Sequence, residues 1–248
     1  MPSVQGVDPS LRDDVQALRW FHRIELAPGL ITPGQDESQA KLAQIRLPER
    51  LDGWSVLDLG AWDGFFSFEA ERRGASRVVA VDPECWREPA WGPDGWGTKR
   101  PFELARRALG SQVEDLDIDL QDISPETVGR FDLVLLLGVF YHLPDPLAVM
   151  RAAASVCERM IIVETHADLL DLKRPAMAYY PGEVDGDESN WWGPNEALLR
   201  ALLETDGFTR TEGFTDSRAR RAARSLARRA RRQPYRYQWG RLVVHGWR

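Results

Sequence analysis

Short apolar runs separated by turns with Gly and Asp mark the chain after residue 50. Residues 56–59 and 78–81 have the composition and length of strands that are buried on both faces. Between them, residues 65–73 carry apolar side chains at helical spacing. This order predicts a β-α-β unit, with a glycine-containing turn after the first strand and Asp82 at the end of the second.

The rest of the chain continues the alternation of strands and helices. The most apolar run, residues 133–137, predicts the central strand. Further strands are expected at residues 113–118, 160–163, 208–214 and 239–247, and helices at 14–21, 41–47, 102–109, 146–156 and after Asn195. The last two strands should pair as an antiparallel hairpin. We therefore predict an α/β fold, a Rossmann-like seven-stranded, mostly parallel sheet with helices on both faces and an antiparallel last strand.

The same pattern predicts one main domain with additions. Residues 1–50 are expected to form an N-terminal helical cap or lid, and residues 51–248 the main domain. Two long segments rich in Gly, Pro and Trp, residues 84–101 and 167–195, are expected to be substrate loops. A basic helix is expected within residues 217–236.

Composition narrows the class of protein. The 248 residues are 43% hydrophobic, with no run near the ~18 apolar residues of a membrane span, so we expect no stable membrane association. The N-terminus lacks a signal-peptide pattern. The two cysteines and four histidines lack metal-binding spacing, so we expect no metal site, reduced cysteines and a cytoplasmic location.

Charge is unevenly distributed. The net charge is −6, yet residues 218–236 hold nine arginines and no acid, and without them 23 basic residues face 38 acidic ones. Such an acidic body does not attract nucleic acid over its whole surface. The arginine-rich segment could be a solvated surface helix, or it could contact an anionic substrate, an RNA backbone or an acidic membrane surface.

The first turn indicates the type of ligand. Asp58, Gly60 and Gly64 define a pattern that is neither the G-x-G-x-x-G of dinucleotide binding nor a P-loop. An acid just before the turn suits a ligand with a cationic amino group better than a phosphate. Asp82 is placed to accept hydrogen bonds from ribose hydroxyls. These residues favour S-adenosylmethionine (SAM) as the ligand; the alternative is a Rossmann-like unit without a cofactor.

Several motifs together resemble a known family. Asp58-x-Gly60, Asp82, Asp122 and residues 138–143 look like a class I SAM-dependent methyltransferase. The segments LDLGAWDGFFSFEAERRGA, LLLGVFYHLPDPL and NWWGPN are similar to the family of tRNA wobble-uridine (5-carboxymethoxyuridine) methyltransferases. One branch of that family uses carboxy-SAM. The turn there has a glycine where Trp62 stands, and the N-terminal region is longer, so this chain also resembles members linked to small-molecule or glycan tailoring.

The resemblance implies a set of donor-site residues. The turn should hold the methionine part of SAM, Asp82 the ribose and Asp122 the adenine amino group. The expected cofactor-binding residues are Lys41, Asp58, Gly60, Ala61, Trp62, Gly64, Asp82, Pro83, Asp122, Ile123 and Gly138. In the carboxy-SAM branch a lysine, a tyrosine and an arginine hold the extra carboxylate, and Lys41, Tyr141 and Arg241 match those positions. We nevertheless expect plain SAM as donor.

The acceptor side is expected where the central strand ends. His142 has the ordinary pKa of a general base, about 6.5, although it could instead be a packing residue. Tyr141 is better placed as a pocket wall, and Glu164 and His166 are further catalytic candidates at the end of the next strand. The expected substrate-binding residues are Trp91, Trp96, Tyr180, Trp191, Trp192, Asn195 and Arg241.

Three functions fit these expectations. The first is O-methylation of a small molecule or glycan by a SAM-dependent tailoring enzyme, with in-line transfer to a base-assisted hydroxyl. The second is a tRNA wobble-uridine (carboxy)methyltransferase that contacts RNA through the basic helix. The third is a non-catalytic SAM-binding protein. The sequence leaves the oligomeric state open.

Overall fold

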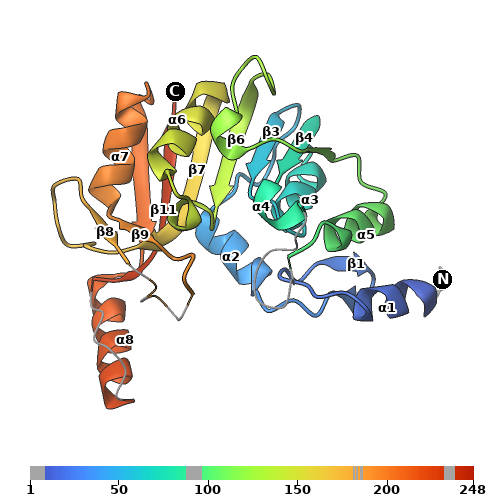
Figure 1. The fold of residues 1–248 in the computed structure, drawn as a ribbon, viewed down its shortest axis with the longest axis horizontal. Coiled ribbons are helices and arrows are strands. Elements are labelled where there is room, and N and C mark those ends of the chain that lie inside the picture. The colour runs from blue at the N-terminus through green and yellow to red at the C-terminus, as the bar shows by residue number, and fades with distance from the viewer. Residues whose placement is uncertain (1–8, 88–96, 181, 183, 185–186, 232–237) are drawn as a thin grey trace. The chain divides into compact units, whose positions relative to one another are not determined.

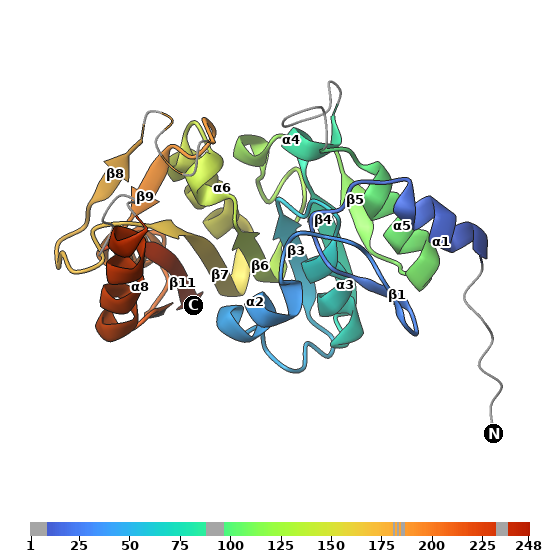
Figure 2. The ribbon, with the colours of Figure 1, turned by 90° about the horizontal axis from the view of Figure 1, so that it is seen from below.

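The computed structural model describes residues 9–87, 97–180, 182, 184, 187–231 and 238–248. The chain forms two compact units, residues 1–120 and residues 121–248. Figures 1 and 2 show the elements of both units.

The first unit contains a parallel β-α-β-α-β arrangement preceded by a helix and a small β-hairpin. Its elements are α1 (Pro9–Gln16), β1 (Glu25–Ala27), β2 (Leu30–Ile31), α2 (Ser38–Ile45), β3 (Ser55–Leu59), α3 (Phe65–Arg72), β4 (Arg77–Val81), α4 (Pro83–Trp86), α5 (Arg100–Leu109) and β5 (Glu114–Leu116). A short 3-10 helix, η2 (Leu120–Asp122), follows at the boundary of the two units.

The three main strands of this unit pair in the order β3-β4-β5, and both pairings are parallel. Ser55 lies opposite Arg77 and Leu59 opposite Val81. The apolar side chains at the centre of β3 and β4 are fully buried, which explains why both strands read as continuous apolar runs. Helix α3 packs against both strands, as Figures 1 and 2 show. The predicted β-α-β unit is confirmed.

The N-terminal region differs from the prediction. The first helix ends at Gln16, whereas the apolar spacing predicts a helix over residues 14–21. After it, the Trp20 indole donates to the Val15 carbonyl, so the chain turns back instead of continuing the helix. Within the segment expected to be a helical cap, residues 25–31 instead hold β1 and β2, which pair antiparallel. Their hairpin is fixed by the Thr32 hydroxyl, which donates to the His22 carbonyl at 2.6 Å.

The second unit contains the most apolar strand and the antiparallel edge of the sheet. Its elements are β6 (Phe131–Leu137), the 3-10 helix η3 (Phe140–His142), α6 (Pro146–Val156), β7 (Cys157–Ala167), β8 (Met177–Tyr179), β9 (Trp192–Pro194), α7 (Glu196–Thr205), β10 (Arg210–Thr215), α8 (Arg218–Ala230) and β11 (Gly240–Trp247).

The main strands of this unit pair in the order β10-β11-β7-β6. Strands β6 and β7 are parallel, whereas β11 runs antiparallel to both β7 and β10. Leu133, Val134, Leu135 and Leu136 of β6 are completely buried. Helix α6 packs on β6 and β7, and α7 on β10 and β11 (Figure 1). The expected hairpin of the last two strands is confirmed.

The seven main strands of the two units establish the predicted fold class, a Rossmann-like, mostly parallel α/β sheet in which the last strand is antiparallel. Among the described residues, no helix has the length and apolarity needed to span a bilayer.

Candidate functional site

The turn after β3 contains two positions whose backbone conformation favours glycine. Gly60 and Gly64 have φ angles of 81° and 87°. The N–H groups of Gly60 and Ala61 both donate to the Val81 carbonyl, at 2.7 and 3.2 Å. A Cβ on Gly64 would lie 2.6 Å from Phe68 and 2.7 Å from Phe102. The turn therefore lies directly against the end of β4, as a nucleoside-binding turn requires.

Asp82 holds this turn from the end of β4. Its Oδ2 accepts the Trp62 N–H at 2.8 Å, and its Oδ1 accepts the Cys85 N–H at 2.9 Å. Pro83 is the first residue of α4, so Asp82 is also the helix cap. Burial is the main cause that raises the pKa of Asp82, to about 6. The backbone of Trp62, which has a φ of 49°, is thus fixed by the acid expected to bind ribose.

Asp58 faces the helix that follows the turn. Its Oδ2 accepts the Ser67 hydroxyl at 2.6 Å, and the residue is 1% exposed. Burial raises the pKa of Asp58 to about 7, and the nearby negative charge of Asp82 contributes in the same direction. Asp58 therefore has a structural partner in α3, and contact with a cofactor remains a prediction.

The structure adds Asp63, which the sequence reasoning did not single out. This fully buried carboxylate accepts the N–H groups of Phe21 and His22 at 2.6 and 2.8 Å. The ring of Phe21 stacks on Trp62, with centroids 4.5 Å apart. The segment before β1 is thus fastened to the turn. Burial raises the pKa of Asp63 to about 7, and burial followed by the charge of Lys41 lowers the pKa of His22 to about 3.

Lys41 reaches this region through Phe21. Its ammonium group lies 5.3 Å from the Phe21 ring centroid and forms an ion pair with Asp36. The charge of Lys41 therefore already has a counterion, and its contact with the cofactor remains a prediction.

These residues fit SAM. Asp58, Asp63 and Asp82 are buried around one turn, and within the described ranges no Lys or Arg forms an ion pair with them. A buried carboxylate without a cationic partner is costly in its charged form, and the positive groups of SAM would relieve that cost. Gly60, with its left-handed φ, lets the turn present its backbone to a ligand without a side chain, whereas Gly64 makes room for Phe68 and Phe102.

The second unit places the remaining donor-site candidates. Gly138 follows β6 with a φ of 76°, and its N–H donates to the Glu164 carbonyl at 2.9 Å. Asp122 is exposed at the end of η2, and Ile123 is 3% exposed. Their expected contacts with adenine remain predictions.

Glu164 and Arg241 form a bidentate ion pair at the ends of β7 and β11. Arg241 Nε donates to Glu164 Oε1 at 2.5 Å, and Nη2 donates to Oε2. The strand register places Arg241 opposite His166 and Val243 opposite Glu164. Arg241 and Glu164 are therefore diagonal neighbours on the two strands, close enough for their long side chains to meet. The guanidinium also lies 5.0 Å from the Tyr141 ring centroid. Both charges are therefore compensated, which disfavours Glu164 as a free base; its catalytic role remains a prediction.

His142 ends η3 and is held by a loop. Its Nδ1 lies 2.9 Å from Ser189 Oγ and 3.1 Å from the Ser189 carbonyl. The Tyr141 ring packs against the imidazole, with centroids 4.0 Å apart. Burial lowers the pKa of His142, and the charge of Arg241 adds to this, whereas Ser189 and Asp187 act in the opposite direction. The imidazole is therefore neutral near pH 7, as a general base requires.

His166 lies in an aromatic cluster beside this pair. It is 5% exposed, and its Nε2 accepts the indole N–H of Trp239. The ring centroid of Tyr180 lies 5.6 Å away, and the Tyr180 hydroxyl donates to Asp168 at 2.6 Å. The structure thus brings the candidates Tyr141, His166 and Tyr180 together at the edge formed by β6, β7 and β11.

The other expected substrate residues have structural partners. The Trp191 N–H donates to the Tyr141 carbonyl, and the Trp192 indole to the Leu143 carbonyl, both at 2.9 Å. Asn195 is fully buried and caps α7, as predicted, with its Oδ1 2.9 Å from the Leu198 N. Trp91 and Trp96 lie outside the described residues. Substrate contact remains a prediction for all five.

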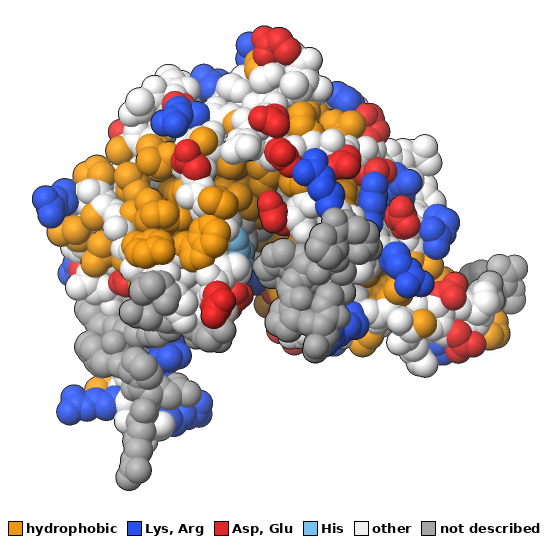
Figure 3. Space-filling model, viewed as in Figure 1, with side chains coloured by type: hydrophobic (Ala, Val, Ile, Leu, Met, Phe, Trp, Pro, Cys, Tyr) orange, Lys and Arg blue, Asp and Glu red, His pale blue; other side chains and the backbone are white. Residues whose placement is uncertain are grey.

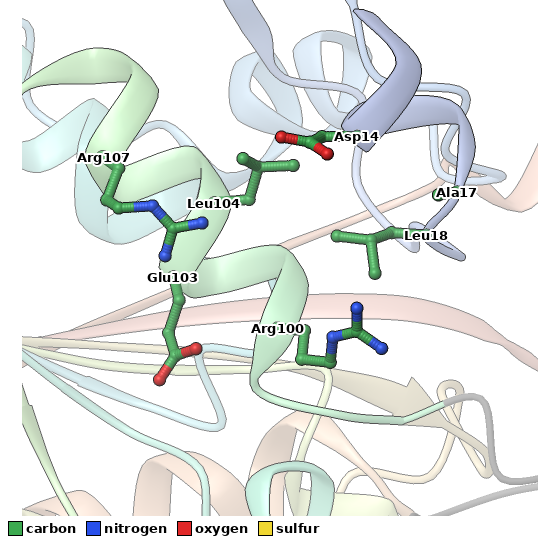
Figure 4. A pocket seen from close by; sticks show the side chains of 7 residues that line it. All are labelled: Asp14, Ala17, Leu18, Arg100, Glu103, Leu104 and Arg107. Atoms are coloured by element: carbon green, nitrogen blue, oxygen red, sulfur yellow. The ribbon is translucent and has the colours of Figure 1, made fainter. Parts of the chain in front are cut away.

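Two further surface features lie outside this edge. A pocket of about 160 Å³ opens between α1 and α5, lined by Asp14, Ala17, Leu18, Arg100, Glu103, Leu104 and Arg107 (Figure 4). None of the predicted site residues lines it. On α8, Figure 3 shows basic side chains in the lower left of the view. Asp171 pairs there with Arg218 and Arg221, and Asp216 with Arg220 and Arg224.

Among the described residues, no group of three His, Cys, Asp or Glu side chains has the arrangement of a metal site.

Two solved structures share this fold. The N-terminal domain of EvdMO1, solved in the presence of SAH and D-fucose, has a TM-score of 0.63 at 20% identity and covers 99% of both chains. Magnesium protoporphyrin IX methyltransferase from Synechocystis PCC 6803, solved with bound SAH, has a TM-score of 0.54 at 18% identity and covers 85% of this chain and 80% of that one.

Curated relatives are also methyltransferases. A tRNA U34 carboxymethyltransferase from Dichelobacter nodosus is 30% identical over 64% of this chain and 46% of its own length. A ubiquinone biosynthesis O-methyltransferase from Pseudomonas aeruginosa is 30% identical over 66% of this chain and 62% of its own. This chain thus spans between about half and three fifths of these relatives.

A family model described as "Methyltransferase domain" matches residues 5–212. That match includes the β3 turn, Asp82, the end of β6 with Tyr141 and His142, and Glu164. The chain therefore belongs to the methyltransferase domain family.

Proposed function

We propose that this protein is a SAM-dependent O-methyltransferase that acts on a hydroxyl of a small molecule or glycan, with His142 as general base. The observation that carries the proposal is the pair of residues at the end of β6. His142 is anchored through Nδ1 and has a lowered pKa, and Tyr141 packs on its ring. A neutral, anchored imidazole is suited to accept a hydroxyl proton.

The donor side rests on the turn after β3. When bound, SAM supplies an already activated methyl group, so the protein mainly orients the reactants. Gly60 lets the backbone of the turn approach the ligand, and Asp82 offers carboxylate oxygens for ribose hydroxyls. The buried carboxylates around the turn favour a cation. Phe21 stacks on Trp62, so an aromatic pair lies beside the turn.

The acceptor side rests on the compensated charges of β7 and β11. The Glu164–Arg241 pair carries no net charge, which suits a neutral hydroxyl compound. His142 takes the hydroxyl proton as the oxygen–methyl bond forms and the sulfur–methyl bond breaks, giving a methyl ether and S-adenosylhomocysteine. The names of the similar proteins, EvdMO1 with D-fucose and ubiquinone O-methyltransferase, support an oxygen acceptor on a sugar or ring.

The test uses labelled SAM in a cell extract separated into RNA and small-molecule fractions. We expect label in the small-molecule fraction, and a loss of about 10²–10⁴-fold in turnover for His142→Gln. SAM affinity, measured by calorimetry, should not change in that variant. Label in neither fraction would favour the non-catalytic SAM-binding alternative, and unchanged turnover in His142→Gln would exclude this residue as the base.

A tRNA wobble-uridine (carboxy)methyltransferase is the second candidate. It is favoured by the similarity to a tRNA U34 carboxymethyltransferase and by the arginines of α8. Two ion pairs argue against the use of carboxy-SAM, because Arg241 is already paired with Glu164 and Lys41 with Asp36. A carboxylate on the donor would have to displace these partners. We therefore propose plain SAM as the donor.

Competition between SAM and carboxy-SAM for the purified protein separates the two candidates. We expect no preference for carboxy-SAM in the wild type. Glu164→Gln should leave the Arg241 charge without its counterion and raise the affinity for carboxy-SAM relative to SAM. Arg241→Ala should not raise this relative affinity. A preference for carboxy-SAM in the wild type that disappears in Arg241→Ala would make RNA the leading substrate.

Cytoplasmic location is part of this proposal. Cys85 and Cys157 are both free and buried, as expected for thiols kept in a reducing compartment.

A further inference from the structure

We propose that Asp187 and Ser189 fix the tautomer of His142, so that Nδ1 carries the proton and Nε2 is the nitrogen that accepts one. This inference rests on the proposed function, because it assigns positioning residues to the proposed base.

Among the described residues, two oxygen atoms of Ser189 lie within hydrogen-bond distance of Nδ1. Ser189 Oγ lies 2.9 Å away and the Ser189 carbonyl oxygen 3.1 Å away. A carbonyl oxygen can only accept a hydrogen bond, whereas a hydroxyl can donate one proton or accept. The tautomer therefore depends on the direction of the single Ser189 hydroxyl proton.

Asp187 takes that proton. Ser189 Oγ lies 2.6 Å from Asp187 Oδ1, and a carboxylate oxygen can only accept. Since the hydroxyl proton is directed to Asp187, Ser189 Oγ must act as an acceptor toward the imidazole. Both neighbours of Nδ1 are then acceptors, and Nδ1 must be the donor. In a neutral imidazole the lone pair then lies on Nε2.

The loop that carries Ser189 is fastened at several points. Asp187 Oδ1 also accepts the Ser189 N–H at 2.9 Å, and the Asp187 N–H donates to the Val184 carbonyl at 3.1 Å. The Trp191 N–H donates to the Tyr141 carbonyl at 2.9 Å. The chain just after Ser189 is thus bonded to the residue just before His142, so the loop and the imidazole are held together.

This geometry has an unusual consequence for mutagenesis. Ser189→Ala removes the hydroxyl but leaves the Ser189 carbonyl, so Nδ1 should keep its proton. Asp187→Ala releases the hydroxyl proton, which can then be donated to Nδ1 and move the imidazole proton to Nε2. The residue that does not touch His142 should therefore matter more than the residue that does.

Nitrogen-15 NMR of the imidazole rings tests the tautomer without any assay of turnover. The chain has four histidines, so the His142 signals can be assigned by their loss in His142→Gln. We expect the Nδ1–H tautomer in the wild type and in Ser189→Ala, and a shift toward Nε2–H in Asp187→Ala. The double variant Asp187→Ala/Ser189→Ala lacks the misdirected hydroxyl and should return to Nδ1–H. An Nε2–H tautomer in the wild type would overturn the inference.

Turnover gives the second readout once an acceptor is known. Asp187→Ala should lower the rate constant for turnover about 10²–10³-fold, within the range of general-base catalysis, and the double variant should recover at least tenfold of that loss. A loop that simply collapses without Asp187 would predict no recovery, and that result would overturn the inference. If NMR shows the expected tautomers while His142→Gln retains full turnover, the positioning is correct and the proposed function of His142 is wrong.

Discussion

The buried carboxylates around the β3 turn and Glu164 near the end of β7 are stabilised in opposite ways. In the first unit, Asp58, Asp63 and Asp82 are at most 4% exposed and accept hydrogen bonds from N–H and O–H groups. In the second unit, Glu164 is 6% exposed and shares two hydrogen bonds with one guanidinium. Burial without a cation raises the pKa of the first group of acids, whereas Glu164 has its counterion within the unit.

This difference separates the expected roles of the two regions. A turn with uncompensated buried carboxylates gains from a ligand that brings positive charge. Near the end of β7, Glu164 and Arg241 already neutralise each other, so a charged acceptor would have to compete with this ion pair. A neutral acceptor leaves the pair intact. The predictions below change one side of this comparison at a time.

The largest effect on stability is expected from adding a side chain at Gly64, in the turn of the first unit. Gly64→Ala would introduce a Cβ 2.6 Å from Phe68 at a φ of 87°. Left-handed strain of about 1–2 kcal/mol and overpacking of about 1–3 kcal/mol should together lower the free energy of unfolding by about 2–5 kcal/mol. Urea denaturation measures this change.

Gly53→Ala is the matched control. Gly53 has a φ of 76° with nothing within 4 Å of the added Cβ, so only the strain of about 1–2 kcal/mol should remain. Equal losses in the two variants would show that Phe68 and Phe102 move aside at little cost.

A slightly smaller effect is expected on donor binding. Asp82→Ala should weaken SAM and S-adenosylhomocysteine by about 1.5–3 kcal/mol, because hydrogen bonds to a charged group are lost. Calorimetry should show this as a roughly 10- to 150-fold rise in Kd. Arg241→Ala, in the second unit, serves as the control and should change SAM affinity much less. Unchanged affinity in Asp82→Ala would place the donor elsewhere.

The pH dependence of stability tests the uncompensated acids directly. Native Asp63 keeps its proton up to about pH 7, whereas an unfolded aspartate loses it near pH 3.8. The native state therefore binds more protons in this window, and the contribution of Asp63 to the free energy of unfolding falls as pH rises. Asp63→Asn keeps an acceptor for the two N–H groups but cannot ionise.

The stability of Asp63→Asn relative to wild type should consequently rise from about pH 4 to pH 7 and then stay constant. At pH 8 we expect Asp63→Asn to be more stable than the wild type by about 1–2 kcal/mol. The gain is limited because the new amide group lacks a second hydrogen-bond partner, which costs part of the stability. Because His22 Nδ1 lies 4.0 Å from Asp63 Oδ2, the comparison is repeated in a His22→Gln background, which removes the titration of His22. A difference that does not change with pH would mean that Asp63 ionises normally.

The smallest effect is expected at the exposed charges of α8. Arg220 is 81% exposed and lies 3.7 Å from Asp216, so Arg220→Ala should change the free energy of unfolding by less than about 0.5 kcal/mol. Arg221→Ala, at a side chain only 4% exposed, should cost more. If Arg220→Ala retains stability but loses retention on an RNA column at low salt, the RNA candidate gains support.

Sequence patterns predicted the strands well because burial on both faces leaves an uninterrupted apolar run. The helix of residues 146–156 coincides with α6, and β3, β4 and β6 begin within two residues of the expected positions. Short strands such as β1 and β2 were missed, since three or fewer residues give no periodicity. The register that pairs them comes from Thr32 and the Gly29 turn.

The candidate site was predicted in part. Asp58, Asp82 and His142 could be found because the ends of parallel strands collect functional side chains. The partners of such residues could not, because they are distant in sequence: Asp63 binds the Phe21 N–H across 42 positions, His142 contacts Ser189 across 47, and Arg241 pairs with Glu164 across 77. Asp63 alone had a local signal, as an acid between the two turn glycines.

Strand β11 is synthesised last, although it pairs in the middle of the second unit's strands. It lies between β7 and β10, and its Arg241 follows Glu164 by 77 residues. At about 5–20 residues per second, a ribosome needs about 4–15 s to bridge that interval. Until then the nascent chain exposes one long edge of β7 and an acid without its counterion. Chaperone contacts, and silent codon changes that slow translation between these two strands, should therefore influence the yield of this protein more than similar changes before β7.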